Sequence, residues 1–231
     1  MSAIGQIALH VTDADRAEAF YLDFAAGVTF ALRLAGEQDI PALSALIPLS
    51  VRSLQAAHYS TAQMDAALGP VFGVDRELIC DGTYFVVEHG RVLAGCGGWS
   101  RRRSLFGGDA GRAAAEAELL DPVHDPARIR AFFVHPDYAR RGIGRRIMHA
   151  CEQAIADAQF RSIELVATLA GEPLYAAFSY DAVERYELPL AGGLMLPVVR
   201  MAKRLQGPGL DQANPTRLPA GMSGFRRRLR P

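Results

Sequence analysis

The sequence has few of the features that mark secreted, membrane-spanning or metal-binding proteins. It contains only three cysteines, Cys80, Cys96 and Cys151, and no CxxC pair, so we expect neither a disulfide framework nor a zinc site. No stretch approaches the ~18 uninterrupted apolar residues that a membrane-spanning helix needs. The first residues lack a basic segment followed by a long apolar run, so no signal peptide is predicted. We therefore expect a cytoplasmic protein with reduced thiols, no metal and no membrane partner.

An excess of charge of either sign is also absent. The chain has 25 basic and 25 acidic side chains, and every basic one except Lys203 is an arginine. A net charge of zero gives no general attraction to nucleic acid, and we interpret the basic end at 225–230 as solvated charge. With 50% hydrophobic and 22% charged residues, the 231-residue chain has the composition of a globular protein with one sizeable core.

Three regions differ in composition. Residues 1–27 hold a short strand pattern followed by a helix pattern, and we predict an accessory segment there. Residues 28–205 alternate strand-like and helix-like segments without a long gap, as expected for one domain. Residues 206–231 are rich in proline, glycine and arginine without periodicity, which predicts a disordered basic tail.

The central region predicts an α/β (α+β) fold, with a mixed sheet and helices on its faces. A hairpin is predicted at 82–100, where two β-rich runs flank a turn at His89-Gly90, and a turn-rich loop at 103–111. The other predicted strands are 29–35, 127–134, 162–169, 182–189 and 194–205. The predicted helices are 40–57 (one or two), 61–68, 142–158 and 172–178.

The segment RAFFVHPDYARRGIGRR, at 130–146, has the pattern of a strand, a basic loop and a helix start. A helix N-terminus presents unpaired backbone N–H groups and a positive dipole end, both of which favour a phosphate. Gly142 and Gly144 would allow the backbone to approach an anion closely. The alternative is a basic turn whose glycines serve packing alone. The arginines around this point are Arg140, Arg141, Arg145 and Arg146.

This segment resembles the pyrophosphate-binding motif Q/R-x-x-G-x-G/A of the GNAT acetyltransferase superfamily. Gly142 and Gly144 match the two small positions, whereas Ala139 stands where the motif has Gln or Arg. The resemblance covers 28–205 and implies a GNAT fold, in which a splayed strand leads into a coenzyme-binding loop. It implies contacts with acetyl-CoA for Phe133 and Val134, on the pantetheine arm, and for Arg140, Arg141, Gly142, Ile143, Gly144 and Arg145, at the pyrophosphate.

A second segment, TLAGEPLYAAFSY, resembles the block N-x-x-A-x-x-L-Y-x-x-x-G-F of the same family. Leu174 and Tyr175 match, and Tyr180 stands for the final aromatic residue. Thr168 replaces the usual Asn, and Ser179 replaces the Gly. The resemblance implies that Tyr175 donates a proton to the leaving thiolate; the alternative is an aromatic side chain that only packs.

The family resemblance implies an N-acetyltransferase that moves an acetyl group from acetyl-CoA to a primary amine. We expect a small-molecule amine, direct attack in a ternary complex, and no metal. A homodimer is left open. The departures from both motifs leave one alternative, a noncatalytic acyl-CoA-binding module. The fold does not identify the acceptor.

Candidates for the acceptor side are weaker. Glu88, in a strand, and the acidic and histidine side chains before residue 127 could accept the ammonium proton, although solvated surface charge is the simpler interpretation. Trp99 and Arg101 lie in an unusual stretch, GCGGWSRRRSLFGGD, that follows the hairpin and could bind an anionic or aromatic acceptor. A loop with solvated arginines is the alternative.

Residues 4–24 resemble the opening strand and helix of a vicinal-oxygen-chelate (glyoxalase-type) domain. The similarity lies in Val11, Asp13, Phe20 and Tyr21, and the family's first metal-ligand position falls on Gln6. The later strands and ligands of such a domain are absent, so we predict a truncated remnant that cannot build a metal site.

Overall fold

The structure is a computed structural model that describes residues 29–104 and 118–205. The predictions for 1–27, including the glyoxalase-like resemblance, and for the tail at 206–231 lie outside these residues. Most of the loop predicted at 103–111 does too. Across the two described ranges, no helix has the length and apolar character needed to cross a membrane.

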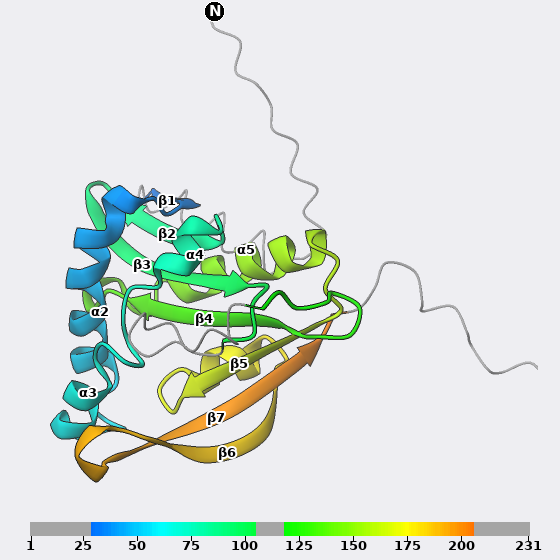
Figure 1. Cartoon of the computed structure of the whole chain (residues 1–231). Coiled ribbons are helices and arrows are strands. Elements are labelled where there is room, and N and C mark those ends of the chain that lie inside the picture. The colour runs from blue at the N-terminus through cyan, green and yellow to red at the C-terminus, as the bar shows by residue number, and fades with distance from the viewer. Residues whose placement is uncertain (1–28, 105–117, 206–231) are drawn as a thin grey trace, which may run out of the picture.

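The centre of the protein is a seven-stranded sheet with the order β1-β2-β3-β4-β5-β7-β6 (Figure 1). Neighbouring strands are antiparallel except β4 and β5, which are parallel. The mixed sheet predicted from the sequence is therefore confirmed. The strands are β1 (Phe30–Leu34), β2 (Tyr84–His89), β3 (Val92–Ser100), β4 (Ala127–Val134), β5 (Ser162–Thr168), β6 (Asp181–Pro189) and β7 (Met195–Arg204).

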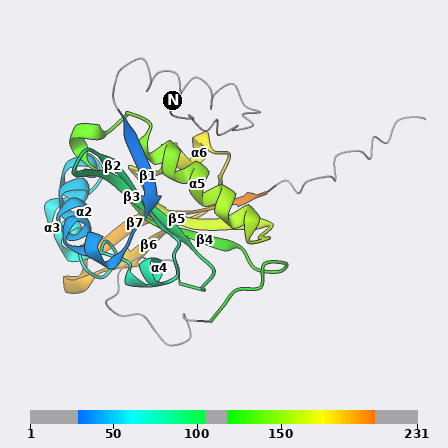
Figure 2. The same cartoon turned by 90° about the horizontal axis from the view of Figure 1, so that it is seen from above.

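Helices cover both faces of this sheet (Figure 2). One face carries α2 (Ile40–Leu54), α3 (Thr61–Ala67) and α4 (Arg76–Cys80), and the other carries α5 (Ile143–Asp157) and α6 (Glu172–Ala177). Each face has its own cluster of buried apolar side chains. The segment predicted as one or two helices at 40–57 forms the single helix α2, and the short helix α4 was not predicted.

Helix α5 has the buried face that its sequence predicts. Ile143, Ile147, Cys151 and Ile155 recur every four residues, and all four are buried against the sheet. The first of them is also the first residue of the helix, so the N-terminus of α5 is held firmly in place.

The two parallel strands pair over only part of their length. Residues 127–129 of β4 pair with residues 163–165 of β5, whereas the β3 side of β4 is paired as far as Val134. Beyond Ile129 the strands separate, and β5 continues along β7 instead. The second half of β4 therefore has one edge that faces a gap, with the start of α5 close by in the chain.

Candidate functional site

A β-bulge shapes the half of β4 that borders the gap. The register with β3 shifts between Cys96 and Gly98, and Ala131 has a positive φ of 60°. The Tyr84 hydroxyl donates to the carbonyl of Ala131 at 3.3 Å. A Cβ at Gly97 would lie 2.5 Å from the ring of Phe132, so the missing side chain makes room for that ring. The bulge thus re-aims the residues that follow it.

Backbone directions after the bulge identify the residues that face the gap. The N–H of His135 donates to the carbonyl of Ala94 on β3 at 2.9 Å, so the main-chain groups of residue 135 face β3. Because these groups alternate along a strand, Val134 and Phe132 direct their main-chain polar groups into the gap. Of the two residues predicted to hold the pantetheine arm, Val134 faces the gap and Phe133 does not. Phe132, which was not among the predicted residues, also faces the gap, and this follows only from the position of the bulge.

The loop before α5 has the backbone geometry of an anion-binding nest. Arg140 and Gly142 have φ values of 63° and 80°, so left-handed residues alternate with others. The first hydrogen bond of the helix runs from the N–H of Arg146 to the carbonyl of Gly142, at 3.0 Å. No N–H group of residues 140–145 donates to another described residue. Successive unpaired N–H groups in such a turn, at a helix N-terminus, form a concave site for an anion.

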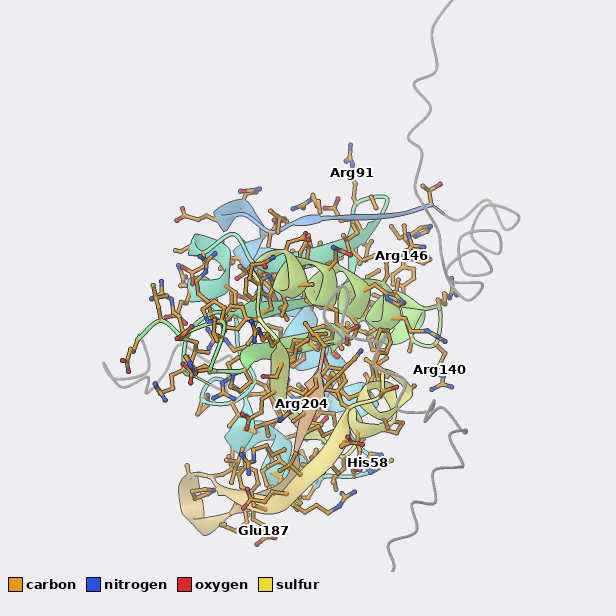
Figure 3. The ribbon with its side chains drawn as sticks, turned by 90° about the vertical axis from the view of Figure 1, so that its right-hand side faces the viewer. His58, Arg91, Arg140, Arg146, Glu187 and Arg204 are labelled. Carbon is orange, nitrogen blue, oxygen red and sulfur yellow. The ribbon has the colours of Figure 1, made fainter. Side chains whose placement is uncertain are left out.

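The four arginines of this loop differ in their surroundings. Arg140 and Arg145 are exposed, and neither is held by an ion pair with a described residue. Arg146 turns back to β1, where its guanidinium donates to the carbonyl of Phe30 at 3.1 Å, and burial lowers its pKa. Arg140 and Arg146 both lie near the start of α5 (Figure 3). The guanidinium of Arg141, also exposed, lies 5.6 Å from the ring centroid of Tyr138. Arg140 and Arg145 can therefore meet an anion, while Arg146 joins α5 to β1.

Different physical requirements explain why glycine occupies the two positions Gly142 and Gly144. Gly142 precedes the helix in a left-handed conformation, and a Cβ there would meet nothing within 4 Å. A Cβ at Gly144 would lie 3.0 Å from Cδ2 of Leu174, in α6. The second glycine thus lets the two sequence blocks pack against each other. The two interpretations drawn from the sequence were close approach of an anion and packing alone, and neither explains both glycines.

Tyr175 lies beside the gap. Its ring packs edge-to-face on Phe132, with centroids 6.1 Å apart, and the residue is 7% exposed. Burial raises the pKa of the phenol well above its ordinary value. The hydroxyl is protonated at neutral pH, as that of an unperturbed tyrosine also is.

Two departures from the second block preserve local geometry. Thr168 stands in place of Asn, and its Oγ1 accepts a hydrogen bond from the N–H of Gly171 at 3.2 Å. Ser179 stands in place of Gly and has a φ of 62°, the left-handed conformation that a glycine favours. The turns before and after α6 therefore form despite both substitutions.

The structure does not bring Trp99 and Arg101 to the gap. Trp99 is 4% exposed in the core on the α5 face, and the Arg101 guanidinium lies 5.8 Å from its ring centroid. Trp99 pairs with Ile129 on β4. Five residues of strand separate Ile129 from Val134, a distance of about 17 Å at ~3.3 Å per residue. The acidic and histidine side chains before residue 127 precede β4, at the end of the strand away from Val134.

Glu88 lies at the end of the sheet that holds Val134, but its carboxylate is hydrogen-bonded to another side chain. It accepts a hydrogen bond from Arg33 at 2.6 Å, and Arg33 also binds both carboxylate oxygens of Asp39 at 2.7 Å. These contacts tie β1, β2 and the start of α2 together. His135 has a turn role, since its Nδ1 accepts from the N–H of Asp137 at 3.2 Å.

In residues 29–104 and 118–205, no group of three or more His, Cys, Asp and Glu side chains could hold a metal ion. The three cysteines are unpaired: Cys80 is exposed, and Cys96 and Cys151 are buried. Burial raises the pKa of the Cys96 thiol to about 12. Its sulfur is therefore a packing atom at neutral pH and not a nucleophile.

Comparison with known proteins gives a family match. Residues 51–180, more than half of the chain, match the model of the family described as "Acetyltransferase (GNAT) family". The comparison with curated proteins finds no match.

Solved structures share the fold at low identity. A GCN5-related N-acetyltransferase from Rhodopseudomonas palustris is 22% identical with a TM-score of 0.57, covering 77% of this chain and 96% of its own. The PaiA N-acetyltransferase from Thermoplasma acidophilum, solved with coenzyme A, is 12% identical with a TM-score of 0.52, covering 77% and 99%. An N-acetyltransferase from Staphylococcus aureus Mu50 has 12% identity, a TM-score of 0.50 and the same coverage.

Proposed function

The chain belongs to the acetyltransferase (GNAT) family, and from this premise we propose that it transfers an acetyl group from acetyl-CoA to the primary amine of a small molecule. The observation that carries the proposal is the run of N–H groups at residues 140–145 without a described acceptor. That run lies next to a strand edge that faces the gap. A pyrophosphate with an extended arm is the kind of ligand that needs both features.

The described residues fit such a coenzyme. The N–H groups of residues 140–145 would bind the pyrophosphate, with Arg140 and Arg145 adding positive charge. Val134 and Phe132 would pair with the amides of the pantetheine arm, in the way that a neighbouring strand would. The PaiA protein from Thermoplasma acidophilum, which shares this fold, was solved in complex with coenzyme A.

The chemistry requires an unprotonated amine, a thioester held at the gap and a proton for the leaving group. The amine nitrogen attacks the thioester carbonyl to form the amide bond, and the C–S bond breaks. Tyr175 would give its phenolic proton to the departing thiolate. The nitrogen becomes positively charged as the new bond forms and releases a proton, and the phenolate would regain a proton from that source. The contact of the Tyr175 ring with Phe132, on the strand edge that faces the gap, supports the assignment.

A noncatalytic acyl-CoA-binding module remains the alternative, because Ala139, Thr168 and Ser179 depart from the motifs. The local geometry favours the enzyme, since Thr168 still binds the N–H of Gly171 and Ser179 still adopts the left-handed conformation that a glycine favours. Ala139 is the remaining departure, and two arginines follow it directly.

The test combines two measurements on the full chain. Calorimetry with coenzyme A measures binding, and an assay of acetyl-CoA consumption against a panel of primary amines measures turnover. The enzyme should bind coenzyme A and consume acetyl-CoA with at least one amine. Binding without turnover across the panel would favour the module, and absence of binding would refute both.

A further inference from the structure

Ser50 is a buried polar residue on the inner face of α2. It is 3% exposed, and its neighbours Leu46, Ile47 and Val51 on this face are buried and apolar. A hydroxyl in such surroundings is destabilising unless it forms a hydrogen bond. Ser50 forms one with the strand beside the gap, where its Oγ accepts from the N–H of Val134 at 3.2 Å.

This bond takes the place of a missing strand partner. In a continuous parallel pair, the N–H of Val134 would donate to a carbonyl of β5, but pairing between β4 and β5 stops at Ile129. A main-chain N–H without an acceptor is costly in a partly buried position. Ser50 therefore satisfies a group that the separation of the strands would leave unpaired.

The region after α2 supplies a second hydroxyl, to the opposite side of the gap. The Tyr59 hydroxyl accepts from the N–H of Leu169, just after β5, at 2.9 Å and donates to the carbonyl of Pro197 at 2.7 Å. Tyr59 thus uses its hydroxyl in both directions and joins two segments of the chain. The described contact of Ser50 with β4 is a single bond, which a ligand can replace at smaller cost.

We propose that Ser50 sets the affinity for the coenzyme by occupying the N–H of Val134 in the free protein. This inference rests on the proposed function, in which the pantetheine arm lies along the same strand edge. A pantetheine carbonyl that pairs with Val134 must first displace the Ser50 hydroxyl. The bond to Ser50 is then exchanged for a bond to the ligand, and the net gain on binding is smaller than for an unpaired N–H.

Replacement of Ser50 by Ala should therefore strengthen coenzyme binding. We expect S50A to bind coenzyme A about two- to tenfold more tightly than the wild type, the range that one exchanged neutral hydrogen bond represents. The matched control is S44A, because Ser44 lies exposed on the same helix and its replacement gives the same gain in helix propensity. Calorimetry with coenzyme A should give wild-type affinity for S44A.

A second measurement does not depend on the coenzyme. Amide hydrogen exchange of Val134 in the free protein should be faster in S50A than in the wild type or S44A, because its acceptor is gone. Faster exchange together with tighter binding supports the proposal. If the wild type binds coenzyme A but S50A binds equally or more weakly, or if Val134 exchange is unchanged, the inference about Ser50 is wrong while the proposed function stands. A wild-type chain that does not bind coenzyme A overturns both.

Discussion

Replacement of Gly142 by Ala separates the two requirements that this position meets, backbone conformation and access for an anion. The residue precedes α5 with a φ of 80°. A left-handed conformation costs a residue with a Cβ about 1–2 kcal/mol, and the lower entropy of the unfolded chain offsets about 0.4–1 kcal/mol of that. Since the new Cβ would meet nothing within 4 Å, no clash adds to this cost. The free energy of unfolding should therefore fall by only about 1 kcal/mol.

Coenzyme binding should respond more strongly than stability. The added methyl group projects from the backbone of the nest, where the proposed pyrophosphate must approach the N–H groups of residues 140–145. An anion held farther away loses short, charge-assisted hydrogen bonds. We expect the dissociation constant for coenzyme A to rise at least tenfold, which corresponds to about 1.4 kcal/mol.

Gly82 provides the matched control. It lies in the turn between α4 and β2 with a φ of 66°, and a Cβ there would also meet nothing within 4 Å. G82A should therefore show a similar loss of stability in urea unfolding, with unchanged affinity for coenzyme A in calorimetry. If G142A binds coenzyme A as tightly as G82A does, the nest at residues 140–145 is not the anion site and the reasoning fails.

Three further changes test the chemistry and the charged contacts. Tyr175→Phe should lower kcat by about 100-fold or more and leave the Kd for coenzyme A unchanged; an unaltered kcat would exclude the phenol as the acid. Arg130→Met would leave Asp75 without its 2.6 Å partner, in a pair whose side chains are 1% and 0% exposed. Its unfolding free energy in urea should drop by about 3–5 kcal/mol, and a drop below about 1 kcal/mol, typical of an exposed pair, would contradict this account. The hydrogen bonds from Arg33 lower the pKa of Asp39 in the folded protein, so its stabilising contribution is complete above the ordinary pKa of about 3.9 and is lost as the pH falls through the lower folded pKa. Asp39→Asn should therefore flatten the acid side of a stability-against-pH curve, and an identical acid side would show that this carboxylate does not contribute.

The sequence was a good guide to elements with strong local patterns. The strand at 127–134 and the hairpin at 82–100 appear where β-rich runs predict them, and α5 differs from its predicted range by one residue at each end. Helix α4 was missed because five residues, RELIC, are too short to show a helical period. Its start depends on Asp75, whose side chain accepts from the N–H of Leu78 at 3.2 Å.

Residue types alone did not separate the alternatives on the acceptor side. A lone tryptophan followed by arginines suggested a binding loop. Trp99 instead lies in strand β3, and its side chain is buried in the core between the sheet and α5. Glu88 could not be separated from a solvated carboxylate until Arg33, 55 residues away in the chain, was found beside it. Both outcomes depend on contacts between distant segments, which no local pattern encodes.

The sequence by itself determined the order of the strands and of the longer helices, the glycine-containing basic turn before α5, and the family to which the chain belongs. These properties follow from hydrophobic periodicity, glycine placement and short motifs, all of which act over a few residues. The tertiary structure alone decided that β4 and β5 separate after Ile129, that a bulge directs Phe132 and Val134 into the gap, and that Ser50 reaches Val134 from the opposite helix. The physical reason is that strand pairing and side-chain contact join residues far apart in the chain. The turn at 140–145 is a local property, whereas the gap beside it exists only once the sheet has formed.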